Sequence, residues 1–415
     1  MGRDLQSVWH PFVQRLTDPD PLPIVRGEGT YLYTEEGEKY LDAISSWWVT
    51  LHGHAHPKIA EAIGRQAKTL EQVIFTDFTH PGAVSVAEEL LELLPEHFTK
   101  VFFTDNGSTA VEVALKMALQ WWKNRKIERK TVVTFRGGYH GDTFGTMSMA
   151  GKNSFNTPFW SYLFEVQQID PPFPGREEVS LNQLKEIMEK DRVAAFLFEP
   201  LIQGATGMRI YSQEGLETLL GVLRADGAFL IADEVMTGFG RTGPLFVSSH
   251  LKVTPDILAL SKGITGGFLP LGATVTTERI YDAFLSSRRE EALLHGHSYT
   301  ANPLACAATL ASLSLLREKS CQQKREWIGK AHKAFCKKLE GTSRLKRIES
   351  LGTILVAEFA GDGGYFSTLR KSLISHFMKH KIIVRPLGNV LYFMPPYCIE
   401  EEDLAHLYQT LESFL

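Results

Sequence analysis

Two short runs of sequence decide the fold class: Ala228-Phe229-Leu230-Ile231-Ala232-Asp233 and Ile257-Leu258-Ala259-Leu260-Ser261-Lys262. Each is an apolar run that ends in polar residues, which is typical of a strand buried on both faces of a parallel sheet. Four more runs share this character, and loops and helical segments separate them: 101–104, 131–135, 194–198 and 272–276. The alternation predicts an α/β fold with a mostly parallel mixed sheet covered by helices.

Length and a change of pattern indicate more than one domain. At 415 residues the chain exceeds the ~100–200 residues of an ordinary domain. Residues 30–42 are typical of a hairpin, and after Asn302-Pro303 the pattern changes to two helices, an isolated strand at 354–359, a further helix and a strand at 382–385. The predicted division is an N-terminal segment (1–50) that packs with the small domain, a large domain (51–302) and a smaller α+β domain (303–415).

Composition excludes several classes of function. The net charge is −4, and the only dense basic stretch is 124–130, so the sequence predicts neither nucleic-acid nor membrane-surface binding. Four scattered cysteines without a C-x-x-C pair are typical of a reducing compartment. The first ten residues lack the apolar core of a signal peptide, and no apolar stretch is long enough to span a bilayer. We therefore expect a cytoplasmic protein.

Reactive side chains follow the predicted strands. In open α/β sheets, ligands bind at the carboxyl ends of the strands. We expect one crevice to receive the residues at these ends: Asn106-Gly107-Ser108, Tyr139-His140, Glu199, Asp233-Glu234 and Ser261-Lys262. A lysine delivered there would lose water, which lowers its pKa and makes it a nucleophile. An ordinary surface lysine is the alternative for Lys262 taken alone.

A lysine and an aspartate on neighbouring strand ends are what pyridoxal phosphate (PLP) chemistry needs. The lysine forms a Schiff base, and the carboxylate keeps the ring nitrogen protonated. Lys262 and Asp233 supply these groups, although Asp233 could also be a turn cap. Asn106-Gly107-Ser108-Thr109 precedes a helix whose N-terminus favours a phosphate, or it is an ordinary helix start with a capping box from Thr109 to Glu112. Tyr139 could stack on the ring or belong to the core.

Two other motifs predict no site. Gly238-Phe239-Gly240-Arg241-Thr242-Gly243 matches the letters of a dinucleotide fingerprint, but it does not follow its strand directly, and Pro244 stands where the helix should begin. The run His52-Gly53-His54-Ala55-His56 lacks the cysteine or carboxylate pattern of a metal centre, so no metal is expected.

Several of these motifs together carry a family resemblance. The run 229–243, the lysine strand, Tyr139-His140-Gly141-Asp142 and His295-Gly296-His297-Ser298 resemble the class III aminotransferases of PLP fold type I over nearly the whole chain. The resemblance implies a PLP-binding large domain and a homodimer with shared active sites. Three further stretches are similar to the members of this family that act in biotin biosynthesis: Trp9-His10-Pro11-Phe12, Ser45-Ser46-Trp47-Trp48 and Arg385-Pro386-Leu387-Gly388.

The resemblance also implies roles for single residues. Lys262 would carry the cofactor and Asp233 would hold its ring nitrogen. The other residues implied at the cofactor are Gly107, Ser108, Tyr139, His297 and Ser298, the last two from the partner subunit. The residues implied at the substrate are Phe12, Trp47, Tyr139, Lys262, Gly296 and Arg385, with Arg385 paired to a carboxylate.

The activity implied by the resemblance is transamination of 8-amino-7-oxononanoate to 7,8-diaminononanoate, with S-adenosylmethionine as amino donor. The chain departs from the family pattern at Phe12, where tyrosine is usual, and at His297, where proline is usual. The alternatives are another ω-amino acid aminotransferase or an aminomutase with lysine or glutamate as donor, or a nonenzymatic scaffold of the same fold.

Overall fold

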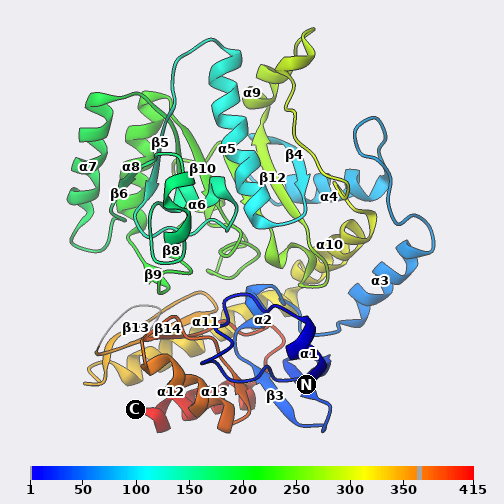
Figure 1. The fold of residues 1–415 in the computed structure, drawn as a ribbon, viewed down its shortest axis with the longest axis vertical. Coiled ribbons are helices and arrows are strands. Elements are labelled where there is room, and N and C mark those ends of the chain that lie inside the picture. The colour runs from blue at the N-terminus through cyan, green and yellow to red at the C-terminus, as the bar shows by residue number, and fades with distance from the viewer. Residues whose placement is uncertain (1, 362–366) are drawn as a thin grey trace.

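The computed structural model describes residues 2–361 and 367–415, and its centre is a seven-stranded sheet (Figure 1). In spatial order the strands are β4 (Phe98–Thr104), β12 (Gly272–Thr277), β11 (Ile257–Leu260), β10 (Phe229–Asp233), β7 (Val193–Phe198), β5 (Thr131–Phe135) and β6 (Gln167–Ile169). The six strands predicted from apolar runs are all in this sheet. The prediction missed β6, because its sequence, Gln-Gln-Ile, has no apolar run.

The sheet is mixed, and one strand runs against its neighbours. β10 pairs in parallel with β7 and β11, whereas β12 pairs antiparallel with both β11 and β4. The predicted α/β class with a mostly parallel mixed sheet is therefore confirmed. Because β12 is reversed, its first residue rather than its last lies at the edge where the parallel strands end.

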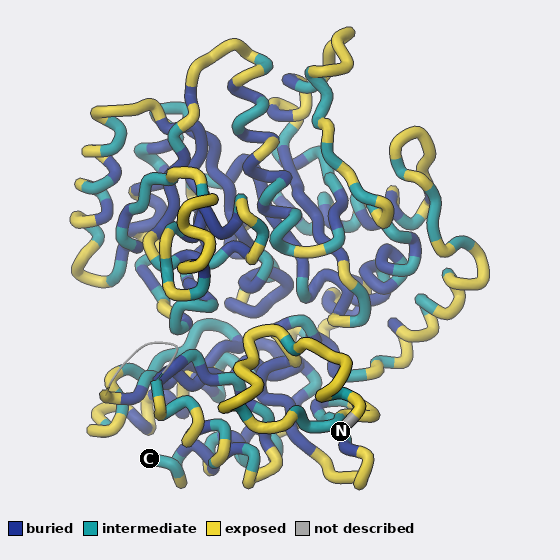
Figure 2. The backbone as a smooth tube through the Cα atoms, in the orientation of Figure 1, coloured by how far each residue is buried: buried dark blue, intermediate teal, exposed yellow. Residues whose placement is uncertain are grey.

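Helices cover the sheet and bury it on both faces. Every residue of β7, β10 and β11 is buried, and Figure 2 shows this central region in dark blue. α5 (Gly107–Asn124) packs on one face, where Trp121 meets Phe229 with ring centroids 5.0 Å apart. The other helices of this part are α4 (Pro81–Glu92), α6 (Phe144–Ala150), α7 (Glu177–Lys190), α8 (Gln213–Asp226) and α9 (Glu278–Tyr281).

Segments from both ends of the chain form a second part. β1 (Ile24–Glu28), β2 (Tyr31–Thr34) and β3 (Lys39–Asp42) join β15 (Ile382–Ile383), which runs parallel to β3. β13 (Leu345–Leu351), β14 (Ile354–Phe359) and β16 (Val390–Phe393) form a three-stranded antiparallel sheet. The strand predicted to be isolated at 354–359 is thus the middle strand of a sheet. The predicted domain limits at residues 50 and 302 stay predictions.

The remaining elements surround these sheets. The helices are α1 (Gly2–Ser7), α2 (Ser45–Trp48), α3 (Pro57–Ala67), α10 (Pro303–Leu316), α11 (Lys319–Leu339), α12 (Leu369–Lys379) and α13 (Glu401–Phe414). A two-stranded hairpin is formed by β8 (Ile202–Gln203) and β9 (Arg209–Ile210). The 3-10 helices are Thr157–Tyr162, Val247–His250, Lys262–Thr265, Asp282–Phe284 and Arg289–Glu291.

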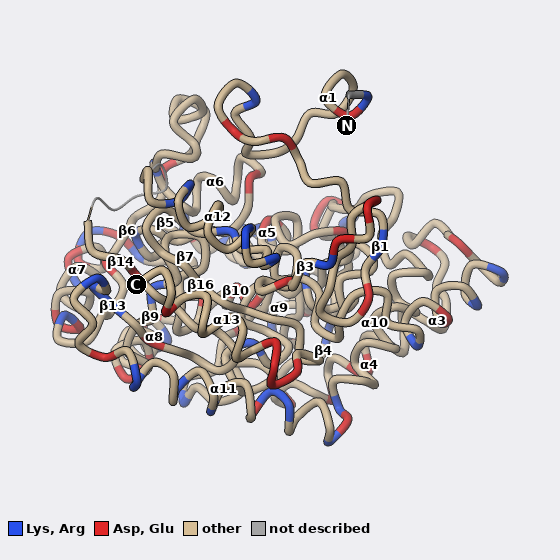
Figure 3. The backbone as a smooth tube through the Cα atoms, turned by 90° about the horizontal axis from the view of Figure 1, so that it is seen from below, with Lys and Arg blue, Asp and Glu red and all other residues tan. Residues whose placement is uncertain are grey.

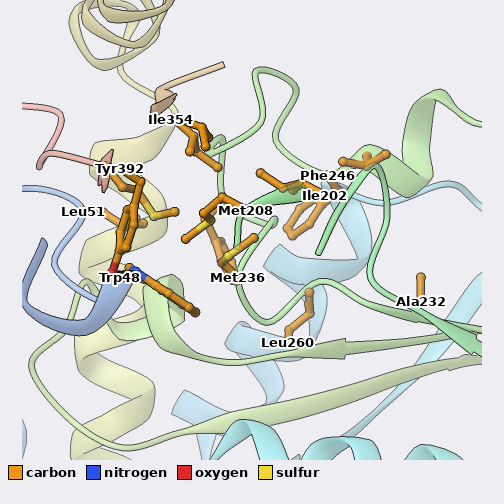
Figure 4. Packing of buried hydrophobic residues seen from close by; sticks show 14 of the residues in the cluster. Trp48, Leu51, Ile202, Met208, Ala232, Met236, Phe246, Leu260, Ile354 and Tyr392 are labelled. Carbon is orange, nitrogen blue, oxygen red and sulfur yellow. Dashed lines mark hydrogen bonds between the residues drawn. The ribbon is translucent and has the colours of Figure 1, made fainter. Parts of the chain in front are cut away.

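One hydrophobic cluster connects the large sheet with the second part. Leu260 of the sheet, Trp48 and Leu51 of the N-terminal segment and Tyr392 of β16 all belong to it. Figure 4 shows Trp48, Leu51 and Tyr392 grouped together, with Leu260 apart from them on the side of the sheet. Figure 3 shows Lys and Arg interspersed with Asp and Glu along the chain. Among the described helices, none combines the length and apolar character needed to cross a bilayer.

Candidate active site

The ends of five parallel strands open into one cavity of about 520 Å³. Its volume is in the range of small-molecule sites. The lining residues at the strand ends are Asn106, Gly107 and Ser108 after β4, Tyr139 and His140 after β5, Glu199 after β7, Asp233 at the end of β10, and Ser261 and Lys262 after β11. Residues 269–271 line the same cavity because they precede the reversed strand β12.

Lys262 begins the 3-10 helix that follows β11, and its backbone has a φ of 46°. This left-handed conformation is costly for a residue with a side chain and is often found at functional sites. The residue is half-buried, and its Nζ lies 4.8 Å from the centroid of the Trp48 ring. Desolvation lowers the pKa of the Lys262 amine, while Asp233 and Glu199 act in the opposite direction. The amine is therefore closer to its neutral, nucleophilic form than a surface lysine is.

Two carboxylates face the same cavity and are held by hydrogen bonds. Asp233 is buried; it accepts from the Val235 N–H at 3.0 Å and from His140 Nδ1 at 2.7 Å. Glu199 is buried as well; it accepts from the backbone N–H groups of Tyr139 at 3.0 Å and Gly204 at 2.9 Å. Burial raises the pKa of Glu199 to about 7, and neighbouring Asp233 adds to this, whereas His140 and the two hydrogen bonds oppose it.

The contact between His140 and Asp233 was not predicted. The sequence placed both residues at strand ends, but only the order β10-β7-β5 in the sheet brings them together. Glu234, also expected in the crevice, points elsewhere. It accepts from the backbone N–H groups of Val247 and Ser248 at 2.9 and 2.8 Å. Successive side chains of a strand point in opposite directions, so Asp233 and Glu234 cannot both face the cavity.

The N-terminus of α5 forms the third wall. Asn106 caps the helix by accepting from the Thr109 N–H at 2.9 Å. The alternative capping box is therefore wrong: Glu112 instead accepts from the Thr143 hydroxyl at 2.5 Å and the Thr146 N–H at 3.2 Å. A Cβ on Gly107 would lie 2.7 Å from a methyl carbon of Val235, so only glycine fits there.

The predicted substrate residues Phe12, Trp47 and Arg385 line the same cavity. The rings of Phe12 and Trp47 meet edge to face with centroids 5.6 Å apart. The Arg385 guanidinium carbon lies 4.3 Å from the Trp47 ring centroid and 5.9 Å from that of Phe12. Trp48 packs deeper, where its Nε1 donates to the Tyr392 hydroxyl at 2.9 Å (Figure 4). The cavity thus has a cation set among aromatic rings at one side and Lys262 at another.

Gly296, His297 and Ser298 do not line this cavity. Gly296 and Ser298 are exposed, and the Ser298 carbonyl accepts from Gln72 Nε2 at 2.8 Å. His297 is half-buried, and its Nδ1 accepts from the Tyr299 N–H at 3.2 Å. A single chain therefore assembles the predicted residues around Lys262 but leaves this loop outside the group.

The two motifs set aside in the sequence have other structural partners. Within 238–243, Arg241 is buried and donates to the carbonyl of Pro395 at 2.9 Å, and no helix follows directly. His52 and His54 bind separate partners, the Ser312 hydroxyl at 3.2 Å and the Asp42 carboxylate at 2.9 Å. Within residues 2–361 and 367–415, no group of three or more His, Cys, Asp or Glu is arranged to hold a metal ion.

The residues of the cavity fit PLP. A desolvated amine and a buried carboxylate reach it from adjacent strands, as the aldehyde and the ring nitrogen require. The N-terminus of the 18-residue helix α5, kept open by Gly107, suits the phosphate. Tyr139 supplies an aromatic ring, and its hydroxyl donates to Asp142 at 2.9 Å.

Comparison with known proteins agrees with this chemistry. Residues 12–415 match the family described as aminotransferase class-III. The chain belongs to the class III aminotransferases. Since these enzymes use PLP, the protein is a PLP-dependent aminotransferase, and the predicted family and cofactor are confirmed.

Individual relatives cover almost the whole chain. The adenosylmethionine-8-amino-7-oxononanoate aminotransferase of Synechococcus elongatus is 44% identical over 419 residues, with 98% of each chain covered. The enzyme of that name from Geobacter sulfurreducens is 37% identical, with 99% of this chain and 96% of the relative covered.

Solved structures extend the comparison. The crystal structure of the Methanocaldococcus jannaschii enzyme of the same name has a TM-score of 0.93 at 33% identity, with 99% of this chain and 98% of that chain covered. A PLP-bound amine transaminase from an uncultivated Pseudomonas species has a TM-score of 0.90 at 28% identity. The match covers 98% of this chain and 97% of the transaminase chain.

Glu199 should give the stability of the protein a specific pH dependence. Its pKa is raised from 4.5 to about 7, so the native state keeps this proton to a higher pH than the unfolded chain does. The stability it contributes is complete below about pH 4.5 and is lost as the pH rises through about 7. The free energy of unfolding of the wild type minus that of Glu199→Gln should fall by up to about 3 kcal/mol over this window.

Urea unfolding at a series of pH values measures this difference. Glu278→Gln is the control, because Glu278 is paired with Lys100 and its pKa is lowered rather than raised. The corresponding difference between the wild type and Glu278→Gln should not fall as the pH rises above 4.5, because with a lowered pKa the native state binds fewer protons than the unfolded chain. A flat curve for Glu199→Gln would contradict the prediction.

Proposed function

We propose that this aminotransferase converts 8-amino-7-oxononanoate to 7,8-diaminononanoate in biotin biosynthesis, with S-adenosylmethionine as the amino donor. The observation that carries the proposal is the position of Arg385 beside Trp47 and Phe12 in the cavity that holds Lys262. The substrate has a ketone to be aminated and an aliphatic chain that ends in a carboxylate. A guanidinium and aromatic walls match the chain and the carboxylate. The names of the relatives from Synechococcus elongatus and Geobacter sulfurreducens support the same substrate.

At the cofactor, each residue of the cavity would have a distinct task. When bound, PLP supplies an electron sink that labilises a proton on the amine-bearing carbon of a substrate. Asp233 would hold the pyridine nitrogen in its protonated form, and His140 fixes the orientation of that carboxylate. Gly107 and Ser108 would hold the phosphate at the N-terminus of α5. Tyr139 would cover the ring face.

Lys262 would act both as the anchor of the cofactor and as the acid and base. A free amine at Nζ can take the proton from the amine-bearing carbon of the donor, and in the second half of the reaction its ammonium form can give a proton to the carbon that receives the amino group. Its lowered pKa helps the first of these steps, because a neutral amine accepts a proton and an ammonium does not. The aromatic wall of Trp47, Trp48 and Phe12 would exclude water from this region.

The donor is the part of the proposal that Phe12 affects most directly. Phe12 is 45% exposed and presents a ring without a hydroxyl to the cavity. A donor held by a hydrogen bond at this point would lose it, whereas one held by apolar contact would not. Lysine and glutamate are therefore the alternative donors that a donor panel must include.

We further propose that the enzyme works as a cytoplasmic homodimer with shared active sites. The loop of Gly296, His297 and Ser298 lies outside the cavity of its own chain and is largely exposed. In a dimer, Ser298 and His297 would reach the phosphate of the partner's cofactor, and Gly296 would touch the substrate there. Exposed apolar residues near this loop, Leu294 and Tyr299, suit a surface that a second copy covers.

The PLP-loaded enzyme should form 7,8-diaminononanoate from 8-amino-7-oxononanoate and S-adenosylmethionine, detected by mass spectrometry. Lysine and glutamate, tested in parallel, should give less product. Product from lysine but not from S-adenosylmethionine would reassign the donor. No product from any donor would overturn the proposed acceptor.

Arg385→Gln tests the carboxylate contact within the same assay. Loss of a charged, bidentate hydrogen bond should raise the KM for the keto acid about tenfold or more. Arg65→Gln is the matched control, because Arg65 lies on α3 and, among the residues that the structure describes, its side chain makes just an exposed ion pair with Glu61. It should leave the KM unchanged.

Borohydride reduction in the presence of PLP should attach a pyridoxyl group to Lys262, because this amine is desolvated and faces the proposed ring site. Digestion and mass spectrometry locate the label. Lys262→Arg should abolish it, and Lys116→Arg, which removes a lysine outside the cavity lining, should not. A label on a different lysine would refute the assignment of Lys262.

Shared sites predict that two inactive variants can complement each other. Lys262→Ala removes the amine, and Gly296→Trp should block the site of the partner without disturbing its own chain, where a Cβ at 296 has an open environment. With random pairing, half of the dimers are mixed, and each has one intact site, so mixing should restore about a quarter of wild-type activity. A mixture of Lys262→Ala with Lys262→Met is the control and should stay inactive. No recovery in the first mixture would argue against shared sites.

A further inference from the structure

A second cavity of about 630 Å³ lies beside the active-site cavity. It is bounded by residues of the β8–β9 hairpin on one side and of β13, β14 and β16 on the other. β9 lies near β13 and β14 in both Figure 1 and Figure 3. Phe155, Ala205 and Leu387 line both cavities. The two spaces therefore share a wall.

The charges in this second cavity do not balance. Arg347 pairs with Glu349 and, at 3.1 Å, with Glu358, whose other oxygen pairs with Lys346 at 2.8 Å. These four side chains neutralise one another. Arg209 also lines the cavity, and nowhere in residues 2–361 and 367–415 does it have a hydrogen-bond or ion-pair partner for its side chain. The charged side chains of the lining thus sum to +1, while Glu358 and Asp170 act on Arg209 by charge without an ion-pair contact.

Arg209 is held in place by its surroundings. Its guanidinium carbon lies 4.1 Å from the centroid of the Phe173 ring. The turn before it is fixed by Arg347, which donates to the carbonyls of Gly207 at 2.7 Å and Met208 at 3.0 Å. Desolvation lowers the pKa of Arg209 and the charge of Arg347 adds to this, whereas Glu358 and Asp170 oppose it. The Arg209 residue as a whole is exposed, but one side of its guanidinium lies against the Phe173 ring, and from there it can pair with an anion in the cavity.

The rest of the lining contains a group of apolar side chains beside the polar residues Ser154, Thr206 and Asn389; the larger apolar ones are Phe155, Phe173, Pro174, Ile210, Leu387 and Val390. An occupant that satisfies both features has one anionic group and an aliphatic chain. We propose that the second cavity binds an aliphatic carboxylate, with Arg209 pairing with the carboxylate and the apolar wall contacting the chain. The inference rests on the proposed function only in its choice of ligand, because the keto acid and its product belong to this class.

The chemistry of the two cavities is related but separable. In each, an arginine lies against an aromatic ring: Arg385 against Trp47 and Arg209 against Phe173. Only the first cavity contains Lys262 and Asp233. A ligand in the second cavity is therefore bound without reacting, next to the cavity where amination of the ketone takes place.

Nonanoate is a suitable probe, because it has the chain and the carboxylate but no ketone or amine that could react. Titration calorimetry of the PLP-loaded enzyme should show two nonanoate sites per chain. Arg209→Gln should leave one site, Arg385→Gln should leave the other, and the double variant should bind none. Each substitution should weaken its own site about tenfold or more. Thermal melting of each variant confirms that it is folded.

Two controls make the result specific. Arg65→Gln removes a positive charge outside both cavities and should keep both sites. Acetate should not saturate at the concentrations where nonanoate does, since it lacks the chain.

A single nonanoate site that Arg385→Gln removes and Arg209→Gln leaves intact would overturn this inference while supporting the substrate contact. A single site that only Arg209→Gln removes would overturn the proposed role of Arg385 and support the inference. Equal binding of acetate would overturn the assignment of an aliphatic ligand.

Discussion

The structure depends on one constraint: an amine and a carboxylate must face the same small cavity from neighbouring strands. The register of β10 and β11 places Asp233 beside Ala259, three residues before Lys262. The left-handed backbone at Lys262 then turns the chain into the 3-10 helix instead of continuing the strand. A buried carboxylate is costly unless it is hydrogen-bonded. Hydrogen bonds from His140 and the Val235 N–H offset this cost at Asp233. They favour the negatively charged carboxylate at the point where a pyridinium nitrogen would pair with it.

The two sides of the cavity are built in different ways. The cofactor side comes from adjacent strand ends of one sheet whose central strands are completely buried. The substrate side is assembled from segments far apart in the sequence. β15 pairs with β3 so that Ile382 faces Leu41, and this brings Arg385 to the neighbourhood of Trp47. A two-residue strand thus positions the cation on which the proposed substrate contact relies.

This difference explains what the sequence could predict. Apolar runs ending in polar residues are a local signal, so six strands and the group around Lys262 and Asp233 could be found. β6 and β13 gave no such signal, because Gln167-Gln168-Ile169 is short and polar and residues 345–351 are only half-buried. The His140 contact depends on strand order, and the side-chain direction of Glu234 depends on the pleat. The loop 296–298 has no place in the cavity of its own chain, so its predicted role concerns an assembly.

Because aminotransferases with different names share this fold closely, the fold by itself does not determine the substrate. An amine transaminase matches this chain with a TM-score of 0.90 at 28% identity, and the Methanocaldococcus jannaschii enzyme with 0.93 at 33%. Both values reflect the same sheet and the same helices, which serve the cofactor. The choice between substrates depends on the side chains that line the substrate side of the cavity, opposite the cofactor. In the proposed function these are Phe12, Trp47 and Arg385, and Arg209 repeats the pairing of guanidinium and aromatic ring in the adjoining cavity. Under this proposal, selectivity for a carboxylate at the end of a chain depends on how segments from the two ends of the polypeptide meet, because the sheet itself serves the cofactor.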